Sequence, residues 1–539
     1  MEREDTADRH SREGADAPSA AGTAPRRADD AAHHAGRREV PVLLAAVFFV
    51  AACGIVYELL IGAAASYLLG DSVTQFSFTI GLFMSAMGLG SYLSRRVRRR
   101  LLDAFLWVEI TLGAVGGAAC LLLFGAYSTS DLYLPVMVLL IFAIGALVGL
   151  EIPLIVRLLE RHTVLRTNIA NVLGLDYAGG LLGAVAFPLL LLPRLGLLRT
   201  GLALGIANLA VGAVVLAHCR RGVVHPRRLA AATGAALLLL ALLTARAATI
   251  QAYLEQRLYR DRVILSRETP YQHVTVTRYH RDVRLFINGN LEFSSIDEYR
   301  YHEPLVHIPA GFVPRVENAL ILGGGDGLAA REILRYPELR AVVLVDIDPD
   351  IVRLCREDPT LRALNAGALE DPRVRVVNTD AYKFLEGDSG LYDLIVVDLP
   401  DPNNEALCKL YTREFYRLAA RRLSRAGALV TQASSPYYAR EAFWCVVGTV
   451  AAAGLNVLPY RAYVPSFGDW GFVVASRGPL SVEGLRLRHS GRFLTPDVAR
   501  DAFRFPQDEA RPDPPPAINT LFSPVLLRLY NRGWDNIRR

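Results

Sequence analysis

Long apolar stretches fill the chain between residues 39 and 250, and a mixed apolar and polar pattern follows them. A helix needs about 20 consecutive apolar residues to cross a bilayer. Seven stretches reach that length, so the pattern predicts a multi-pass α-helical membrane domain over 39–250. They cover 41–64, 74–94, 102–126, 131–156, 172–193, 197–218 and 229–248.

Basic residues alternate between the connectors of this domain. Arginine clusters precede the first stretch and follow the second, fourth and sixth, whereas the connectors at 69–73 and 127–131 have no basic residue. The positive-inside rule therefore predicts a cytoplasmic N-terminus. Seven crossings would then place the second half of the chain outside the cell. The fifth stretch contains Asp176, Pro188 and Pro193, and a re-entrant or broken helix there would return that half to the cytoplasm.

The first 38 residues carry both charge signs and show no apolar periodicity. Such a composition does not bury a core. The segment also lacks the apolar region and small-residue cleavage site of a signal peptide. We therefore predict a disordered cytoplasmic tail over 1–38.

The second half of the chain shows two further patterns. Over 251–310, apolar and polar residues alternate at 274–277 and 283–287, and Asn288-Gly289 is a hairpin turn signal, so we predict a small antiparallel β subdomain. Over 311–480, apolar strands at 316–322, 341–345, 374–377 and 394–397 alternate with helices, which predicts an α/β Rossmann-like domain with a parallel, doubly wound sheet. Residues 481–539 form a C-terminal tail with an amphipathic end.

Composition supports this division. The chain of 539 residues is 52% hydrophobic with a mean hydropathy of +0.26, which excludes an ordinary soluble enzyme and a disordered protein. The net charge of +6 comes almost wholly from arginine, much of it in short runs between apolar stretches. These runs are a topology signal, so the charge predicts no nucleic-acid partner. The six cysteines show no metal-binding or disulfide spacing, which predicts no metal site and a reducing compartment for the second half.

A glycine-rich turn follows the first strand of the α/β domain. Residues 323–327 read Gly-Gly-Gly-Asp-Gly and precede a helix. Glycines let the backbone approach a ligand closely. Asp346 ends the second strand about 20 residues later, where an acidic residue binds ribose hydroxyls. The pattern predicts a nucleoside site, and the alternative is a glycine turn needed only for packing.

The charge of Asp326, inside that turn, restricts the ligand. A phosphate-binding loop does not place a carboxylate where the anion sits. A nucleoside with a cationic tail fits better, and decarboxylated S-adenosylmethionine keeps only an ammonium on its tail, which Asp326 would attract. The alternative is that Asp326 caps the following helix.

Three more carboxylates follow strands of the predicted sheet. Asp380 is placed to accept a hydrogen bond from an adenine amino group, and Asp398 and Asp401 follow the strand at 394–397. Open α/β sheets bind ligands at the carboxyl ends of their strands. A single aspartate there is more often a cap or a solvated loop residue. Several converging carboxylates are costly unless they hold cations.

At these residues the chain resembles the spermidine synthase (polyamine aminopropyltransferase) family over roughly 251–480, and in particular its membrane-attached multi-pass branch. The matching segments are Tyr271-Gln272, Asp297-Glu298-Tyr299-Arg300-Tyr301-His302-Glu303, residues 323–327, Val345-Asp346-Ile347-Asp348-Pro349, Asp380, Val397-Asp398-Leu399-Pro400-Asp401-Pro402 and Pro465-Ser466-Phe467-Gly468-Asp469-Trp470-Gly471-Phe472. The resemblance implies a class I methyltransferase-like fold. It also implies that a diamine, typically putrescine, attacks the methylene beside the sulfonium of decarboxylated S-adenosylmethionine. The products are a spermidine-like polyamine and methylthioadenosine, with no cofactor besides this co-substrate.

The resemblance also implies a role for individual residues. Asp398 is the expected catalytic base, because an amine of high pKa must lose a proton before it attacks. Gln272, Asp346, Asp380 and Ala381 are expected to bind the nucleoside. Tyr301, His302, Asp326 and Asp401 are expected to bind the polyamine or the aminopropyl ammonium, and Trp470 to line the pocket. For Tyr301, His302 and Trp470 the alternative is a position in the core.

Two positions depart from the family pattern. Glu292 stands where the family commonly has Gln, and Asn403-Asn404-Glu405 stand where it commonly has Gly-Pro after the Asp-Pro. Both changes add acid near the amine site. They bear on the identity of the acceptor more than on the reaction.

Two other classes of protein remain open. A methyltransferase on the same fold is disfavoured, because Asp326 would repel the methionine carboxylate and the pair Asp398 and Asp401 would have no role. A polyamine transporter or sensor is suggested by acids in the apolar stretches, where charged residues are usually functional. These are Glu58, Glu109, Glu151 and Asp176, and interfacial placement or pairing with arginines is their alternative.

The expected partners are a small diamine, decarboxylated S-adenosylmethionine and the lipid bilayer, and a homo-oligomer stays open. The expected location is the cell membrane, with the catalytic domain in the cytoplasm.

Overall fold

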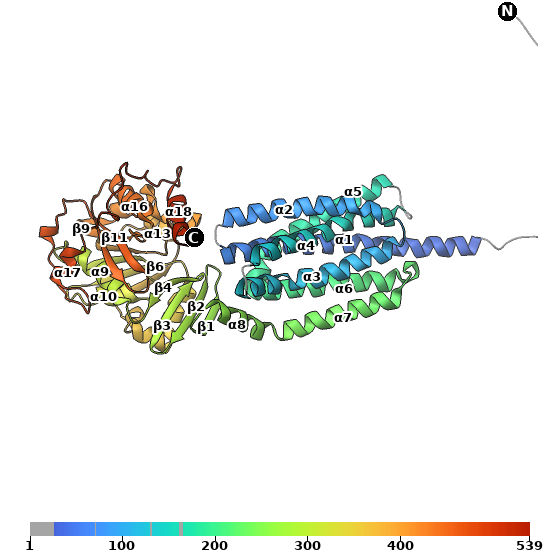
Figure 1. Ribbon diagram of the computed structural model, residues 1–539, viewed down its shortest axis with the longest axis horizontal. Helices are drawn as coiled ribbons and strands as arrows, with labels where there is room; N and C mark the ends of the chain where they lie inside the picture. Colours follow the sequence, from blue (N-terminus) through green and yellow to red (C-terminus); the bar gives the residue numbers. More distant parts are fainter. Residues whose placement is uncertain (1–25, 70–71, 130–131, 161–164, 539) are drawn as a thin grey trace, which may run out of the picture.

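The computed structural model describes residues 26–69, 72–129, 132–160 and 165–538, and it consists of a helical bundle joined to an α/β domain (Figure 1). Most of the tail predicted over 1–38 lies outside the described residues, and the rest belongs to the first helix, which begins at Arg26. A small four-stranded sheet stands where the bundle and the α/β domain meet.

Six helical segments of the described chain are long and apolar enough to cross a membrane. The fifth, Asn168–His218, has 51 residues. A straight helix of that length would extend about 75 Å, more than twice the hydrocarbon core of about 30 Å. It therefore comprises two helices, and the bundle helices are α1 (Arg26–Leu69), α2 (Ser72–Leu93), α3 (Leu101–Thr129), α4 (Tyr133–Leu159), α5 (Leu165–Ala186), α6 (Leu192–His218) and α7 (Pro226–Ala245).

The chain turns at Gly196, which lies inside α6 near its start. Gly196 has a φ of 70°, a left-handed value that interrupts the helix. Before it, α5 runs parallel to α1, because Gly179 packs against Phe48 and Gly183 against Ala52. Helix α5 is continuous, and a single π turn (Phe187–Leu191) follows it. The fifth apolar stretch therefore forms a continuous helix followed by a π turn, and not a re-entrant or broken helix.

Helix α6 runs in the opposite direction to α3. Gly201 packs against the backbone of Gly117, and Gly205 packs against that of Gly113. Residue numbers therefore rise along α6 as they fall along α3. Small residues at these contacts let the helix backbones approach closely. Since short connectors reverse the chain between neighbouring helices, α1 begins and α7 ends at opposite ends of the bundle (Figure 1).

The small sheet joins the bundle to the α/β domain through α8 (Ala247–Leu258). Its strands are β1 (Arg262–Glu268), β2 (His273–Tyr279), β3 (Asp282–Ile287) and β4 (Asn290–Ser294), in antiparallel order. Asn288 and Gly289 have φ values of 50° and 81°, as a type I′ turn between β3 and β4 requires. The predicted hairpin turn is confirmed.

The α/β domain contains a mixed seven-stranded sheet in the order β10-β11-β9-β8-β5-β6-β7. Strands β5 to β9 are parallel, whereas β11 is antiparallel to β9 and to β10, which corrects the expected all-parallel sheet. The four predicted strands are present as β5 to β8. The bounds are β5 (Asn318–Gly323), β6 (Ala341–Asp346), β7 (Val374–Asn378), β8 (Tyr392–Asp398), β9 (Leu423–Gln432), β10 (Asn456–Val464) and β11 (Gly468–Ser476).

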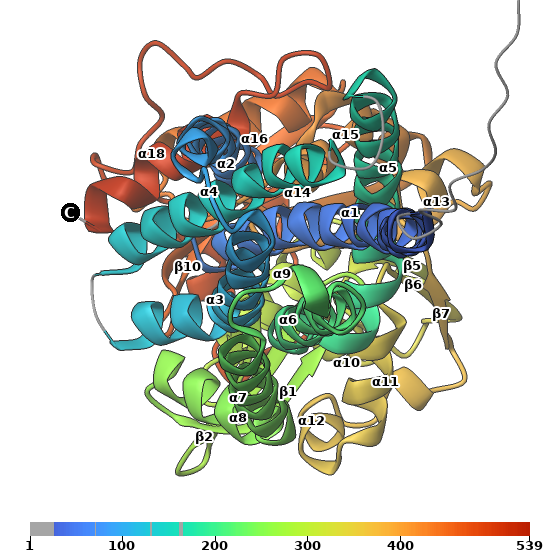
Figure 2. The same cartoon turned by 90° about the vertical axis from the view of Figure 1, so that its right-hand side faces the viewer.

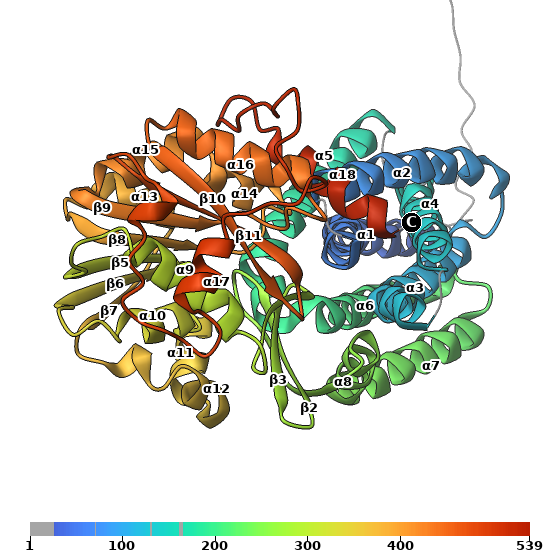
Figure 3. The ribbon, with the colours of Figure 1, turned by 60° about the vertical axis from the view of Figure 1, so that its left-hand side comes forward.

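Helices cover both faces of this sheet (Figure 3). One face packs on α9, α10, α11 and α12, and the other packs on α13, α15 and α16. Their bounds are α9 (Tyr299–Ala310), α10 (Leu328–Ile333), α11 (Pro349–Glu357), α12 (Pro359–Leu364), α13 (Ala381–Gly387), α14 (Glu405–Cys408), α15 (Arg413–Arg421) and α16 (Arg440–Ala452). The central strands β5, β6 and β8 are buried on both sides, so they are almost continuously apolar in sequence.

The C-terminal segment folds back over the α/β domain. It contains α17 (Pro496–Asp501) and α18 (Leu526–Arg538), and α18 lies beside α16 (Figure 2). The amphipathic end predicted from the sequence is α18, whose apolar side chains join the core beneath α16.

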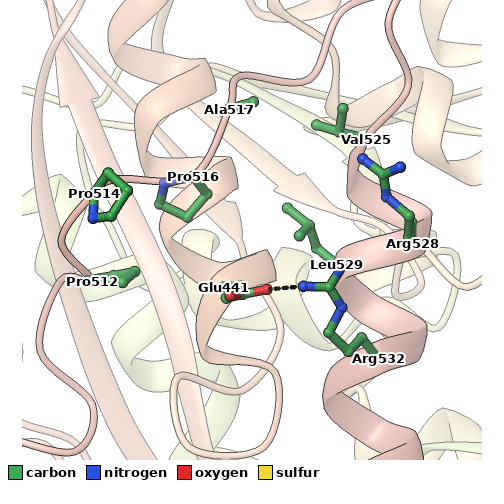
Figure 4. A pocket seen from close by; sticks show the side chains of 9 residues that line it. All are labelled: Glu441, Pro512, Pro514, Pro516, Ala517, Val525, Arg528, Leu529 and Arg532. Atoms are coloured by element: carbon green, nitrogen blue, oxygen red, sulfur yellow. Dashed lines mark hydrogen bonds and ion pairs between the residues drawn. The ribbon is translucent and has the colours of Figure 1, made fainter.

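A surface pocket separates α16 and α18 from the proline-rich segment before α18 (Figure 4). At this pocket Arg532 of α18 forms an ion pair of 3.2 Å with Glu441 of α16, which links the two helices. None of its lining residues belongs to the carboxylate cluster described below.

Candidate active site

The glycine turn lies at the carboxyl end of β5, beside β8. The order of the sheet reverses between these strands, and open α/β sheets bind ligands at such a point. Gly323 has a φ of 87°, and a Cβ there would lie 2.0 Å from the carbonyl oxygen of Asp398. The Gly324 N–H donates to the same oxygen at 3.0 Å. Glycine is therefore required for the close contact between the turn and β8.

Asp346 is fixed at the end of β6. Its Oδ2 accepts a hydrogen bond from the Gly325 N–H at 3.0 Å, and its Oδ1 accepts one from the Asp348 N–H at 2.8 Å. Burial raises the pKa of Asp346 to about 6. A Cβ on Gly325 would lie 2.5 Å from Asp346 Oδ2, so the turn and the carboxylate also need this glycine.

Gln272 is brought to this edge by a short loop before β2. The Thr269 hydroxyl donates to Asp348 Oδ2 at 2.8 Å, and the Thr269 N–H donates to the Gln272 carbonyl at 2.9 Å. The next residue, His273, contacts the end of α1, where Tyr67 Oη lies 2.5 Å from His273 Nδ1. The loop that carries Gln272 is thus attached both to β6 and to the membrane bundle.

Asp398 ends β8 and receives a hydrogen bond from Tyr301. The Tyr301 hydroxyl donates to Asp398 Oδ1 at 2.8 Å. Burial, reinforced by the charge of Asp326, raises the pKa of Asp398 to about 6. Tyr301 is only 8% exposed and packs against Phe467 and Phe472. Its ring is a core aromatic, while its hydroxyl reaches the site.

Asp326 lies at the start of α10. Its Oδ1 accepts a hydrogen bond from the Leu328 N–H at 2.8 Å, as the capping alternative predicted. Its charge also interacts with His302 and Asp398. Burial raises the pKa of Asp326, whereas His302 and the Leu328 N–H oppose that rise.

His302 is held as a cation beneath these carboxylates. Burial favours the neutral ring, but Glu298, whose Oε2 lies 2.9 Å from His302 Nδ1, and the nearby acids raise the pKa of His302 to about 9. Glu298 in turn accepts two hydrogen bonds of 2.9 Å from Arg331. A protonated His302 would balance the charge of the acids and repel an ammonium, so its expected part in binding the polyamine stays a prediction.

Asp401 follows β8 and faces the end of β9. Its Oδ2 accepts a hydrogen bond from the Ser434 hydroxyl at 3.1 Å, and its Oδ1 accepts one from Gln432 Nε2 at 3.2 Å. Tyr530 of α18 also donates to it. Burial raises the pKa of Asp401 to about 6 in spite of these donors.

Asp380 and Ala381 begin α13, beyond β7. Asp380 Oδ1 caps this helix by accepting from the Tyr382 N–H at 2.7 Å, and Oδ2 lies 3.2 Å from Lys409 Nζ. Burial alone would raise the pKa of Asp380, but these two donors lower it. Ala381 is buried in the core at this end of the sheet.

Glu292 on β4 interacts electrostatically with the same group of acids. Burial raises the pKa of Glu292 well above its ordinary value, and Asp401, Asp326 and Asp398 raise it further. The small sheet thus adds another carboxyl group to those at the ends of β5, β6 and β8.

The turn between β10 and β11 closes one side of this region. The Ser466 N–H and hydroxyl donate to Asp297 at 2.7 and 2.9 Å, which fixes the turn to the segment before α9. Trp470 packs against Phe467, and its indole N–H is buried without an acceptor among the described residues.

Three supporting residues were not predicted. Gln432 ends β9 and Ser434 follows it. Tyr411 donates to the carbonyls of Leu399 and Pro400 at 3.2 and 3.0 Å. A polar residue at the end of a parallel strand or just after it is a detectable signal for Gln432 and Ser434, but β9 itself was not predicted. Tyr411 has no sequence signal.

The structure therefore brings Gln272, Tyr301, Asp326, Asp346, Asp398 and Asp401 to one edge of the sheet, with His302 behind them and Asp380 and Ala381 beyond β7. A Rossmann-like fold with a glycine turn and acids around its switch point is typical of nucleoside-binding enzyme domains, and here it is attached to a bundle of long apolar helices. Comparison with known proteins gives the family.

A family model described as "Spermine/spermidine synthase domain" matches residues 298–482. The polyamine aminopropyltransferase of Oceanobacillus iheyensis is 42% identical over 495 residues, which cover 90% of this chain and 96% of the relative. Polyamine aminopropyltransferase 1 of Ralstonia nicotianae is 43% identical over 526 residues, covering 96% and 100%. A crystal structure of spermidine synthase in complex with the transition state analogue AdoDATO is 23% identical and covers 45% of this chain and 85% of its own, with a TM-score of 0.43.

The chain belongs to the polyamine aminopropyltransferase family. Both alignments with the full-length relatives are longer than the whole segment after residue 250, so they include apolar helices of the bundle. The resemblance found in the sequence is confirmed.

Proposed function

We propose that this protein moves an aminopropyl group from decarboxylated S-adenosylmethionine to a putrescine-like diamine. The amine nitrogen forms a bond to the methylene carbon beside the sulfonium, and the carbon–sulfur bond breaks. The electron pair of that bond stays on sulfur, which gives neutral methylthioadenosine. The proton lost by the attacking nitrogen passes to Asp398. The observation that carries the proposal is the group of buried carboxylates around the β5–β8 switch point.

The nucleoside lies along the ends of β5, β6 and β7. The glycine turn allows close approach, Asp346 accepts hydrogen bonds from the ribose hydroxyls, and Gln272 closes the site from the small sheet. Asp380 accepts from the adenine amino group next to Ala381. A nucleoside bound there extends its sulfonium toward Asp326 and Asp398.

The amine site lies between Asp398 and Asp401. A base with a pKa near 6 is ionised at neutral pH and still accepts a proton from an ammonium as the nitrogen attacks. Tyr301 orients Asp398, Asp326 binds the aminopropyl ammonium, and Asp401 binds the far ammonium of the diamine. Holding two cations in line supplies much of the rate by orientation.

Turnover of the purified full-length protein tests this proposal. Decarboxylated S-adenosylmethionine with putrescine should yield methylthioadenosine and an amine heavier by one aminopropyl group. Intact S-adenosylmethionine should yield neither. A product heavier by one methyl group would identify a methyltransferase, and binding of amines without any turnover would identify a sensor or transporter.

We further propose that the protein lies in the cell membrane with its catalytic domain in the cytoplasm. A cytoplasmic location gives access to the nucleoside substrate, and it suits six cysteines that are all free and buried. With the alternating helices described above, this orientation places the start of α1 and the arginine-rich connectors on the other side, against the positive-inside rule. The cytoplasmic N-terminus expected from the sequence and the cytoplasmic catalytic domain exclude each other in this fold.

A further inference from the structure

Three polar side chains from three helices meet inside the membrane bundle. Glu109 of α3 and Asn208 of α6 are 0% exposed, and Glu151 of α4 is 4% exposed. Asn208 Nδ2 donates to Glu109 Oε2 at 2.8 Å and to the Glu109 carbonyl at 3.1 Å. The carboxyl groups of Glu109 and Glu151 lie within hydrogen-bonding distance of each other.

Both acids are enclosed by the bundle, and among the described residues neither is neutralised by arginine. No arginine or lysine of the described chain forms an ion pair with Glu109 or Glu151, and both are enclosed by neighbouring helices. A hydrogen bond between two carboxyl groups requires a proton on one of them. Ionisable side chains inside a membrane bundle are costly and commonly mark a binding site or a pathway for ions.

The cluster has acceptors that nothing in the described chain satisfies. Glu109 Oε1, Glu151 Oε1 and Asn208 Oδ1 are buried and receive no hydrogen bond from these residues. The buried Tyr57 hydroxyl of α1 also has no partner there, and it interacts electrostatically with both carboxyl groups. Leaving a buried polar atom without a partner destabilises the fold, so three such acceptors around two acids indicate a ligand that donates hydrogen bonds.

The missing ligand needs a positive charge and several donors. A primary ammonium carries one positive charge and three N–H donors, one for each of the three unmet acceptors. A single proton shared by the two acids leaves Asn208 Oδ1 unmet. A divalent metal fits poorly, because among the described residues no three histidine, cysteine or acidic side chains are grouped as metal ligands.

We propose that Glu109, Glu151 and Asn208 form a binding site for a primary ammonium group inside the bundle, separate from the catalytic site. The ammonium takes the place of the shared proton and donates to the three unmet oxygens. Asp176 of α5, which is half-buried and interacts with Glu151, adds negative charge for a second amino group. The ligand class is therefore an alkylamine with more than one amino group.

Equilibrium binding of radiolabelled putrescine to the full-length protein in nanodiscs tests this site. Glu151→Gln and Glu109→Gln should each bind one putrescine fewer per chain than the wild type, whatever the catalytic site binds. Asn208→Leu should weaken that same site about tenfold, the loss of one hydrogen bond to a charged group. Glu58→Gln, which changes another acid in the apolar helices, is the matched control and should bind as the wild type does.

Two results would overturn the proposal. One is an unchanged number of bound putrescine molecules in both glutamine variants, with gel filtration used to check that they elute as the wild type does. The other is complete displacement of putrescine from this site by an equal concentration of Na⁺ or K⁺, which would make it an alkali-cation site. Because the readout is the difference between variants, it stands even if the catalytic proposal fails.

Discussion

The Tyr301 hydroxyl donates a 2.8 Å hydrogen bond to Asp398 although the two residues are 97 positions apart. Tyr301 belongs to α9, which follows the small sheet, and Asp398 ends the central strand β8. Aromatic packing of Tyr301 against Phe467 and Phe472 fixes its ring, so the hydroxyl fixes the carboxylate. The proposed base is therefore oriented by a side chain from another part of the fold.

Replacement of the proposed base should abolish the chemistry and spare binding. Asp398→Asn removes the proton acceptor, so kcat should fall by roughly 10²–10⁴-fold while methylthioadenosine still binds. Asp393→Asn, at the opposite end of β8, is the matched control, because Asp393 accepts hydrogen bonds from Glu317, Asn318 and Ser424. It should lower stability with little change in kcat. Equal kcat for Asp398→Asn and the wild type would refute the assignment.

The pH profile should report the same carboxylate. Asp398 must be ionised to accept a proton, and its pKa is raised to about 6. Activity is therefore expected to be full above that value and to fall as the pH drops through it. A kcat/KM profile with an acid limb near the ordinary pKa of an aspartate would show that another group controls the reaction.

Loss of the Tyr301 hydroxyl should move this acid limb upward. The hydrogen bond from Tyr301 stabilises the charged form of Asp398, so Tyr301→Phe should raise the pKa by about one unit. Tyr416→Phe removes another buried hydroxyl, which contacts Thr431 and not Asp398, and it should leave the limb in place. The measurement is kcat/KM over a range of about four pH units around neutrality.

The catalytic domain should become less stable in alkali, because His302 loses its stabilising positive charge there. The folded-state pKa is about 9 against an ordinary value of 6.5, so its stabilising effect is complete below the lower value and disappears as the pH rises through the higher one. The full effect is on the order of 3 kcal/mol. Thermal unfolding of the wild type should shift to lower temperature across this interval. Glu298→Gln, which removes the main partner of His302, should flatten that dependence, and Glu338→Gln should not.

Glu292 should determine how tightly the acceptor binds. The charge of a diamine in the site favours the ionised form of Glu292, so Glu292→Gln should raise KM for putrescine about tenfold, equivalent to about 1.4 kcal/mol. KM for the nucleoside and kcat should change little. A monoamine acceptor should be less affected, since it carries no second ammonium. An unchanged KM for putrescine would remove Glu292 from the amine site.

The orientation of the helices predicts opposite locations for the two ends of the chain. Reporters that distinguish the cytoplasm from the outside, fused before Met1 and after Arg539, should give opposite signals, because α1 to α7 alternate in direction. We expect the C-terminal reporter in the cytoplasm. Identical signals at both ends would mean that one of the seven helices does not cross the bilayer.

The sequence by itself was sufficient to predict the two-part architecture, the strands β5 to β8 and the hairpin turn. The apolar stretches, the strand periodicity and Asn288-Gly289 are local signals, and buried parallel strands leave a nearly continuous apolar run. The glycine turn and the acids after strands were detectable for the same reason. The carboxyl ends of parallel strands meet at one edge of such a sheet, whatever conformation the loops adopt.

Only the tertiary structure decided which of these residues act on one another. The protonated state of His302 depends on Glu298 and on acids from other strands, and the turn at Gly196 becomes evident only from the neighbours of α5 and α6. The supports of Asp401 come from β9 and α18, both distant in sequence. Electrostatic interactions and side-chain packing depend on distance in space, and a local pattern of residues carries no information about which distant segment lies within a few ångströms.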